Sequence, residues 1–292
     1  MNVFHPARPL PPGPAAHAVK AWSDILALVS STSPWSPAAL TAAALAQTHG
    51  SVLTGCYIEA ELRSLMGADT DQPEFALLRQ HPSQCAERQA EPEFRALARR
   101  YGINRSRWEV AATGIARTLR QLAPWHDLVV MERDLAGEDR VIEVLGEALL
   151  ACKVPCILLP SGPTAFRDFP RVVVAWDGSM QATRSLHAAL PLLQNATKVV
   201  LLDGFVRSSD EDIVPSFDPC EYLSEHGVHV RHQVIHADAR TSGSVILESA
   251  RLHEADLVVM GAYGHSTLRE RVLSGATRYM LRHAGLPLFI LH

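Results

Sequence analysis

The chain has 292 residues, 47% of them apolar, which is enough for two hydrophobic cores of ordinary size. A net charge of −4 gives no electrostatic basis for binding nucleic acid. No run approaches the roughly 20 apolar residues that span a bilayer, so no membrane partner is expected. Five cysteines without regular spacing favour a reducing compartment, and the expected location is the cytoplasm.

The first half begins with residues 1–20, which we expect to be a flexible lead because residues 5–14 contain five prolines. Apolar runs predict strands at Asp24–Ser30, Asp127–Met131 and Val154–Pro160. Between them, 59–93 is rich in Gln, Glu, Pro and Arg, and this pattern predicts a helical excursion. Pro, Gly and Ser then mark 161–169 as a linker.

The second half alternates predicted strands with predicted helices. Val228–Ile235 alternates apolar and polar residues, which is typical of a half-covered strand near a sheet edge. Pro191 inside a helical pattern predicts a kink or an early helix end. The other expected strands are Val172–Trp176, Lys198–Val206, Leu257–Met260 and Leu288–Leu291, and the expected helices are Ser179–Leu193, Pro219–His226, Gly243–His253 and Gly275–Ala284.

The two halves repeat one pattern. Asp127–Met131 and Asp256–Met260 are the same pentapeptide, and Asp24–Ser30 aligns with Arg171–Asp177. The order of elements predicts two tandem α/β domains, 21–160 and 170–292. Each is an open, five-stranded parallel sheet with helices on both faces. We expect the domains to pack as an internal pseudo-dimer through their final strands, and a homodimer remains open.

The copies differ in two places. After the shared pentapeptide the second copy continues with Gly261 and Gly264, whereas the first continues with Glu132 and a loop three residues shorter. The opening strand of the second copy ends in Asp177-Gly178-Ser179, where the first has Ser30-Ser31. Because both differences fall at carboxyl ends of strands, where such sheets bind ligands, they predict one site in the second half only.

The chemistry of this site points to an anion. Glycines let the backbone approach a ligand closely, and Ser274 can cap the following helix. A helix N-terminus presents unpaired N–H groups and a partial positive charge, which suits a phosphate chain. An ordinary tight turn also uses glycines at this spacing, so a turn without a ligand is the alternative.

Asp177 at a strand end, Gly261-x-x-Gly264, and a glycine-hydroxyl pair nine residues later resemble the universal stress protein family, here as a tandem-domain member with a degenerate first copy. In its nucleotide-binding branch a glycine precedes Ser or Thr after those nine residues, whereas here Ser274 precedes Gly275. The resemblance implies a Rossmann-like, adenine-nucleotide alpha-hydrolase-like fold for each domain, with ATP as the cofactor, with or without Mg²⁺. It also implies that Asp177 contacts the adenosine, that Gly261 and Gly264 wrap the ribose and phosphates, and that Gly275, Ala276 and Thr277 bind phosphate oxygens.

His265 and Ser274 are assigned to the same nucleotide site. His265 could also act as a base, but no sequence feature gives it a partner, and no catalytic residue is predicted. His229 and His232 would point to opposite faces of a strand, so no metal site is predicted. The leading interpretation is a regulatory protein of the stress response that binds ATP in its second half. The alternatives are a scaffold that binds no nucleotide and a slow ATP hydrolase.

Overall fold

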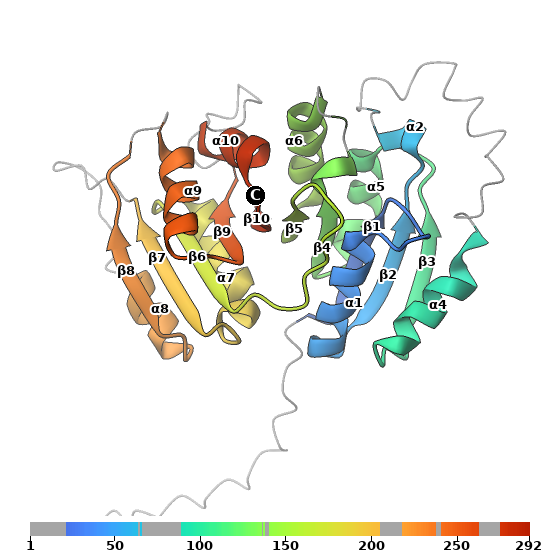
Figure 1. Cartoon of the computed structure of the whole chain (residues 1–292), viewed down its shortest axis with the longest axis horizontal. Helices are drawn as coiled ribbons and strands as arrows, with labels where there is room; N and C mark the ends of the chain where they lie inside the picture. Colours follow the sequence, from blue (N-terminus) through green and yellow to red (C-terminus); the bar gives the residue numbers. More distant parts are fainter. Residues whose placement is uncertain are drawn as a thin grey trace, which may run out of the picture.

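The computed structural model describes residues 22–63, 65, 89–135, 137, 140–204, 218–237, 241–262 and 275–292. The strands form one ten-stranded sheet in the order β3-β2-β1-β4-β5-β10-β9-β6-β7-β8, with the halves side by side (Figure 1). The strands are β1 (Asp24–Val29), β2 (Val52–Tyr57), β3 (Ser106–Val110), β4 (Leu128–Glu132), β5 (Cys156–Leu159), β6 (Arg171–Trp176), β7 (Lys198–Asp203), β8 (Val230–Val234), β9 (Leu257–Gly261) and β10 (Leu288–Leu291).

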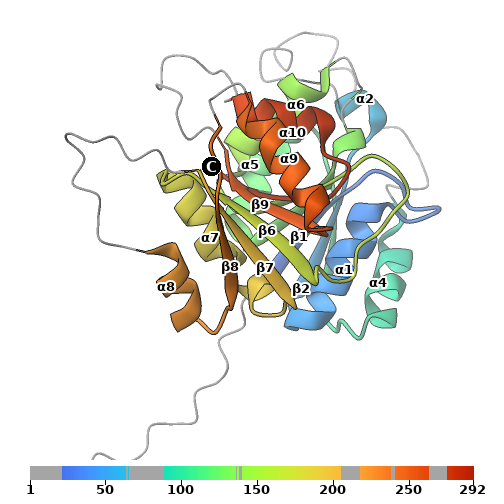
Figure 2. The same cartoon turned by 60° about the vertical axis from the view of Figure 1, so that its left-hand side comes forward.

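Helices cover both faces of the sheet (Figure 2). On one face α1, α4, α7 and α8 enclose one core, and on the other α5, α6, α9 and α10 enclose a second core. The helices are α1 (Pro37–His49), α2 (Ala60–Arg63), α4 (Glu91–Arg100), α5 (Ile115–Leu122), α6 (Val141–Cys152), α7 (Met180–Leu193), α8 (Pro219–Glu225), α9 (Ser242–Leu252) and α10 (Gly275–His283).

The strand order of the first half, β3-β2-β1-β4-β5, is the order of the second, β8-β7-β6-β9-β10, read from its own edge. Pairs within each half are parallel, whereas β5 and β10 pair antiparallel and join the halves. The expected parallel α/β fold and the junction through the final strands are therefore confirmed. Arg133 also crosses the junction, donating to the carbonyl of Ala284 at 3.2 Å.

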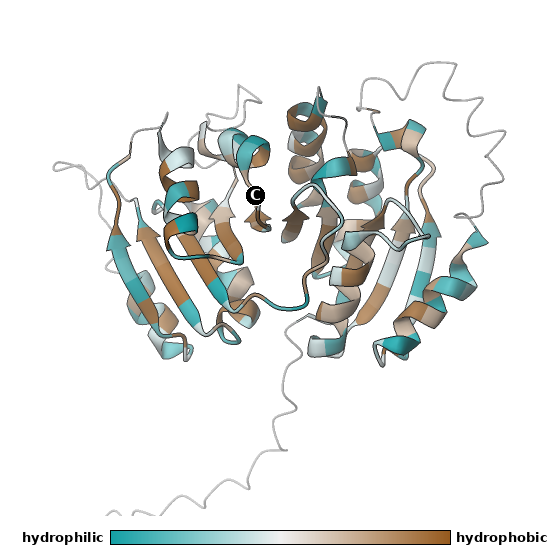
Figure 3. Ribbon diagram, viewed as in Figure 1, coloured by the Kyte–Doolittle hydropathy of each residue, from teal (hydrophilic) through white to brown (hydrophobic). Residues whose placement is uncertain are grey.

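Most sequence-predicted elements of the second half lie within two residues of the observed bounds. β8 is a polar edge strand, as its alternating pattern predicts, and both edge strands are more hydrophilic than the central ones (Figure 3). The prediction that Pro191 shortens its helix is wrong, because α7 continues to Leu193. Pro191 removes one backbone bond of the helix, but the helix continues because the N–H of Gln194 still donates to the carbonyl of Leu190 at 2.9 Å. Residues 66–88, and with them most of the predicted excursion, lie outside the described residues.

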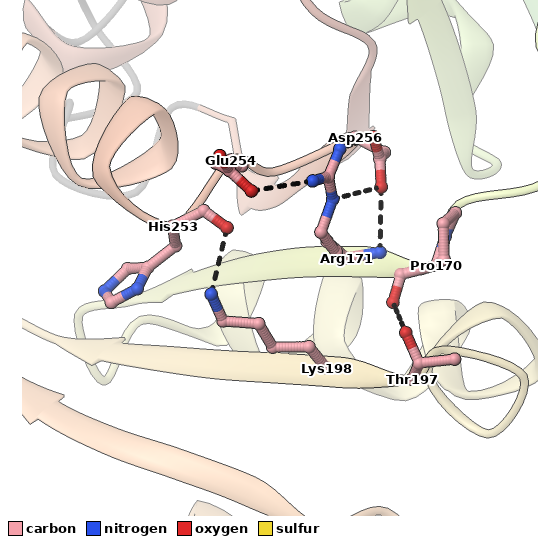
Figure 4. A network of polar contacts seen from close by, with 7 residues as sticks. All are labelled: Pro170, Arg171, Thr197, Lys198, His253, Glu254 and Asp256. Atoms are coloured by element: carbon pink, nitrogen blue, oxygen red, sulfur yellow. Dashed lines mark hydrogen bonds and ion pairs between the residues drawn. The ribbon is translucent and has the colours of Figure 1, made fainter.

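The acid of the repeated pentapeptide has the same structural role in both halves. Asp256 accepts the backbone N–H of Arg171 at 3.0 Å, and Asp127 accepts that of Asp24 at 3.1 Å. In the second half the Arg171 guanidinium adds two bonds to Asp256, at 3.0 and 2.8 Å, and one to Glu254 at 2.9 Å (Figure 4). Each aspartate thus fixes the start of the neighbouring central strand.

Candidate functional site

The structure brings Asp177 and Gly261 to the same edge of the sheet. β6 and β9 are parallel neighbours, and Ala175 is in register with Met260. Gly261 is the last residue of β9, and Asp177 follows the last residue of β6. Both residues therefore stand at the carboxyl ends of adjacent strands, as the sequence predicts.

The half-buried Asp177 shapes the turn that leads into α7. Its carboxylate accepts the N–H of Ser179 at 3.0 Å, and Gly178 between them has a left-handed φ of 79°. The Ser179 hydroxyl then accepts the N–H of Ala182 at 3.2 Å and caps the helix. Asp177 is thus held at the entrance of α7 by the turn that follows it.

Gly261 is explained by packing in this structure. A Cβ built on Gly261 would lie 2.5 Å from the backbone nitrogen of Ala182 and 2.7 Å from the carbonyl carbon of Gln181. Both atoms belong to the first turn of α7, and backbone cannot move aside as the end of a side chain can. The glycine therefore lets α7 begin directly against the end of β9, whether or not a ligand approaches it.

Only some of the remaining predicted site residues lie in the part of the chain that the structure describes. Gly264, His265 and Ser274 lie outside the described residues. Gly275, Ala276 and Thr277 open α10, where Gly275 is exposed, Ala276 is half-buried and Thr277 is buried. The structure therefore brings Asp177 and Gly261 to one edge of the sheet, and the binding site itself stays a prediction.

The second half also matches a known family. A model of the universal stress protein family matches residues 168–292. The C-terminal half is a universal stress protein domain. Universal stress protein Slr1230 from Synechocystis sp. is 24% identical over 135 residues, which is 46% of this chain and 45% of the relative. The matched part thus spans about half the length of that relative.

Solved structures cover the whole chain. A universal stress protein from Archaeoglobus fulgidus DSM 4304 is 16% identical, with 93% of this chain and 96% of that chain covered and a TM-score of 0.64. A protein from Pseudomonas aeruginosa UCBPP-PA14 is 13% identical, with 94% and 95% covered and a TM-score of 0.62. At these identities the structures show that the fold is shared across both halves.

The counterpart of the site in the first half carries a carboxylate. Glu132 follows the shared pentapeptide where the universal stress protein domain has Gly261, and Ser30 stands at the position of Asp177. Glu132 is only 5% exposed. It accepts the N–H of Ala38, in the first turn of α1, at 2.9 Å and the Ser30 hydroxyl at 3.0 Å. A residue of the chain itself thus occupies this helix N-terminus.

Arg63 closes the same corner of the first half. Its guanidinium donates to the carbonyls of Ser30 at 2.6 Å and Ile58 at 2.9 Å. Burial lowers the pKa of Arg63, and the Tyr57 and Glu132 charges act in the opposite direction. The sequence shows Glu132 in place of Gly261 but does not show that its carboxylate binds the N-terminus of α1.

The described residues contain no group of three or more His, Cys, Asp or Glu that could hold a metal ion. His232 instead lies 3.1 Å from the carboxylate of Asp203 on the neighbouring strand. Within the same residues, no helix has the length and apolar character needed to cross a membrane.

Proposed function

We propose that the chain is a regulatory protein of the stress response that binds ATP, or a related adenine nucleotide, in its C-terminal half. The observation that supports this most is the meeting of Asp177 and Gly261 at adjacent strand ends, within the residues that match the family. Open α/β sheets bind ligands at this edge.

In this proposal Asp177 contacts the adenosine, while Gly261 and Gly264 border the ribose and phosphates. Ser274, Gly275, Ala276 and Thr277 bring the phosphates to the N-terminus of α10, where N–H groups and the helix dipole favour negative charge. His265 is assigned to the same binding site. No residue is assigned a catalytic role, so a regulatory function is proposed rather than hydrolysis. The proposed cytoplasmic location rests on the odd number of cysteines, five.

We assign residues 21–160 to a degenerate domain, 161–169 to a linker and 170–292 to the nucleotide-binding domain. The repeated strand order supports this division, since β5 ends at Leu159 and β6 begins at Arg171. Glu132 supports the loss of binding in the first domain, because its carboxylate already accepts the N–H of Ala38 and would repel a phosphate.

A scaffold that binds no nucleotide is the second candidate. The observation in its favour is that contact with α7 alone accounts for Gly261. Under this reading the two glycines would serve packing and a turn, and the fold would present surfaces to a protein partner.

Two matched glycine variants separate these candidates. Gly264→Val should abolish ATP binding while leaving the thermal unfolding midpoint unchanged, because a side chain there blocks backbone approach to the phosphates. Gly137→Val is the control from the first half, where an added Cβ meets no atom within 4 Å. It should bind ATP like the wild type. Equal ATP affinity in both variants, measured by equilibrium dialysis, would overturn the site assignment and favour the scaffold.

A further inference from the structure

An open surface cavity of about 550 Å³ lies where the two halves meet. Four of its lining residues are basic: Lys153, Arg184, His187 and His292, of which the first three are exposed. The rest of the lining is a threonine, an alanine and a leucine, so no acidic side chain lines it. Lys153 follows α6 of the first half. Arg184 and His187 belong to α7, and His292 follows β10. The cavity thus depends on both halves.

The antiparallel junction explains why these residues converge. Ile290 of β10 is in register with Cys156 of β5, so the start of β5 lies beside the end of β10. Lys153 ends α6 with a left-handed φ of 57°, and His292 follows the last residue of β10. α7 is tied to the same strand end, because the N–H of Leu291 donates to the hydroxyl of Ser185 at 3.1 Å.

Several lining side chains are held by neighbours. The His292 ring nitrogen Nδ1 lies 3.3 Å from the carbonyl oxygen of Ala262. The His187 ring stacks on Tyr222 of α8, with ring centroids 4.4 Å apart and planes 7° apart. The Thr183 hydroxyl accepts the indole N–H of Trp176 at 3.1 Å, which leaves its own proton for another acceptor. These contacts limit the side-chain freedom that a ligand would otherwise have to restrict.

Lys153 and Arg184 carry the permanent positive charge of the cavity. Among the ion pairs of the described residues, none includes Lys153 or Arg184. Burial lowers the pKa of His292, and the charges of Lys153 and Arg184 lower it further. The charges of Lys153 and Arg184 therefore both act on the His292 ring. An anion bound beside them would reduce the repulsion between the two cations.

We propose that this cavity binds a small anion carrying one or two phosphate groups. A guanidinium fork and an ammonium group are the protein groups best suited to phosphate oxygens, and the Thr183 hydroxyl can add a third donor. The volume is ample for an anion of this size. The site is separate from the proposed nucleotide site, and because its walls come from both halves, the bound anion stabilises their junction.

The test is a calorimetric titration of the full-length protein with inorganic pyrophosphate, without magnesium. The wild type should bind one pyrophosphate per chain, and the double variant Lys153→Gln/Arg184→Gln should bind about tenfold more weakly. The control Arg100→Gln/Arg117→Gln removes the same charge from two exposed residues outside the cavity and should bind like the wild type. Absence of binding at millimolar pyrophosphate, or equal loss in both double variants, would overturn the proposal.

Repeating the titration with Gly264→Val separates the two sites. Unchanged pyrophosphate binding in this variant supports a separate site, even if the wild type fails to bind ATP. Loss of pyrophosphate binding in Gly264→Val would place the anion in the phosphate seat of the nucleotide site, and the proposal of a separate site would then be wrong.

Discussion

The two halves place different residues against the first turn of an equivalent helix. In the second half Gly261 ends β9 and touches the backbone of α7, whereas in the first half Glu132 ends β4 and accepts an N–H of α1. The helices also start differently, since Ser179 caps α7 two residues after Asp177, and Ser36 caps α1 six residues after Ser30. The longer connection before α1 leaves space for the Glu132 side chain at the N-terminus of this helix.

Under the proposed function, the first half has lost its ligand site while the N–H of Ala38 keeps a partner in Glu132. A helix N-terminus favours an anion, whether the anion comes from solution or from the chain itself. In the first half the carboxylate of Glu132 fills that role, and Arg63 closes the corner beside it.

The largest effect is expected for Gly261→Val. The new side chain would meet the backbone of Ala182 and Gln181, so the free energy of unfolding should fall by about 3 kcal/mol. ATP binding should be lost with the displacement of α7. Gly137→Val is the control, and its free energy of unfolding should lie within about 0.5 kcal/mol of the wild-type value. Urea unfolding of both variants measures this, and equal stability would refute the packing role.

Glu132→Ala should be the next most severe change. It leaves the buried N–H of Ala38 without its carboxylate, which costs about 2 kcal/mol. Glu132→Gln keeps an oxygen acceptor and should lose less. Neither variant should alter ATP affinity, because the carboxylate lies in the other half. A fully stable Glu132→Ala protein in urea unfolding would show that this bond does not hold the first half together.

Asp177→Asn should change function more than stability. The amide oxygen can still accept the N–H of Ser179, so the free energy of unfolding should change by no more than about 0.5 kcal/mol. ATP should bind about tenfold more weakly, because a charged acceptor makes stronger hydrogen bonds than an amide. Ser30→Ala, the counterpart in the first half, should leave ATP affinity unchanged. An Asp177→Asn protein with wild-type affinity by calorimetry would contradict the proposed contact.

The smallest effect concerns pH and Asp256. Hydrogen bonds from Arg171 hold the pKa of Asp256 below its ordinary value. The folded pKa is depressed, so the stabilisation is complete above the unfolded value of about 3.9 and is lost as pH falls through the folded pKa. Asp256→Asn should therefore have a lower free energy of unfolding than the wild type at pH 7, and this difference in free energy should become smaller at acid pH. If the difference in unfolding free energy between the two proteins stays constant from pH 7 to pH 3, this linkage is excluded.

The fold could be predicted largely from the sequence, because the repeated pentapeptide and the apolar runs mark the central strands of both halves. The same patterns placed Asp177 and Gly261 at one edge of the sheet. The reason for Gly261 could not be predicted, because it depends on where α7 begins in space. The role of Glu132 was hidden for the same reason, since the loop before α1 determines which atoms it meets.

The basic cavity could not be found from the sequence either. Lys153 and Arg184 are far apart in the chain, and only the antiparallel pairing of β5 with β10 places them around one cavity. The sequence predicted packing through the final strands but not the antiparallel direction or the register of that pairing, and these decide which residues meet.

The most direct test of the account is the number of ATP molecules bound per chain. Calorimetric titration of the nucleotide-free wild type with ATP, with and without magnesium, should give one site per chain, because Glu132 occupies the equivalent position in the first half. Two equivalent sites, or no binding at millimolar ATP, would contradict the proposed difference between the halves.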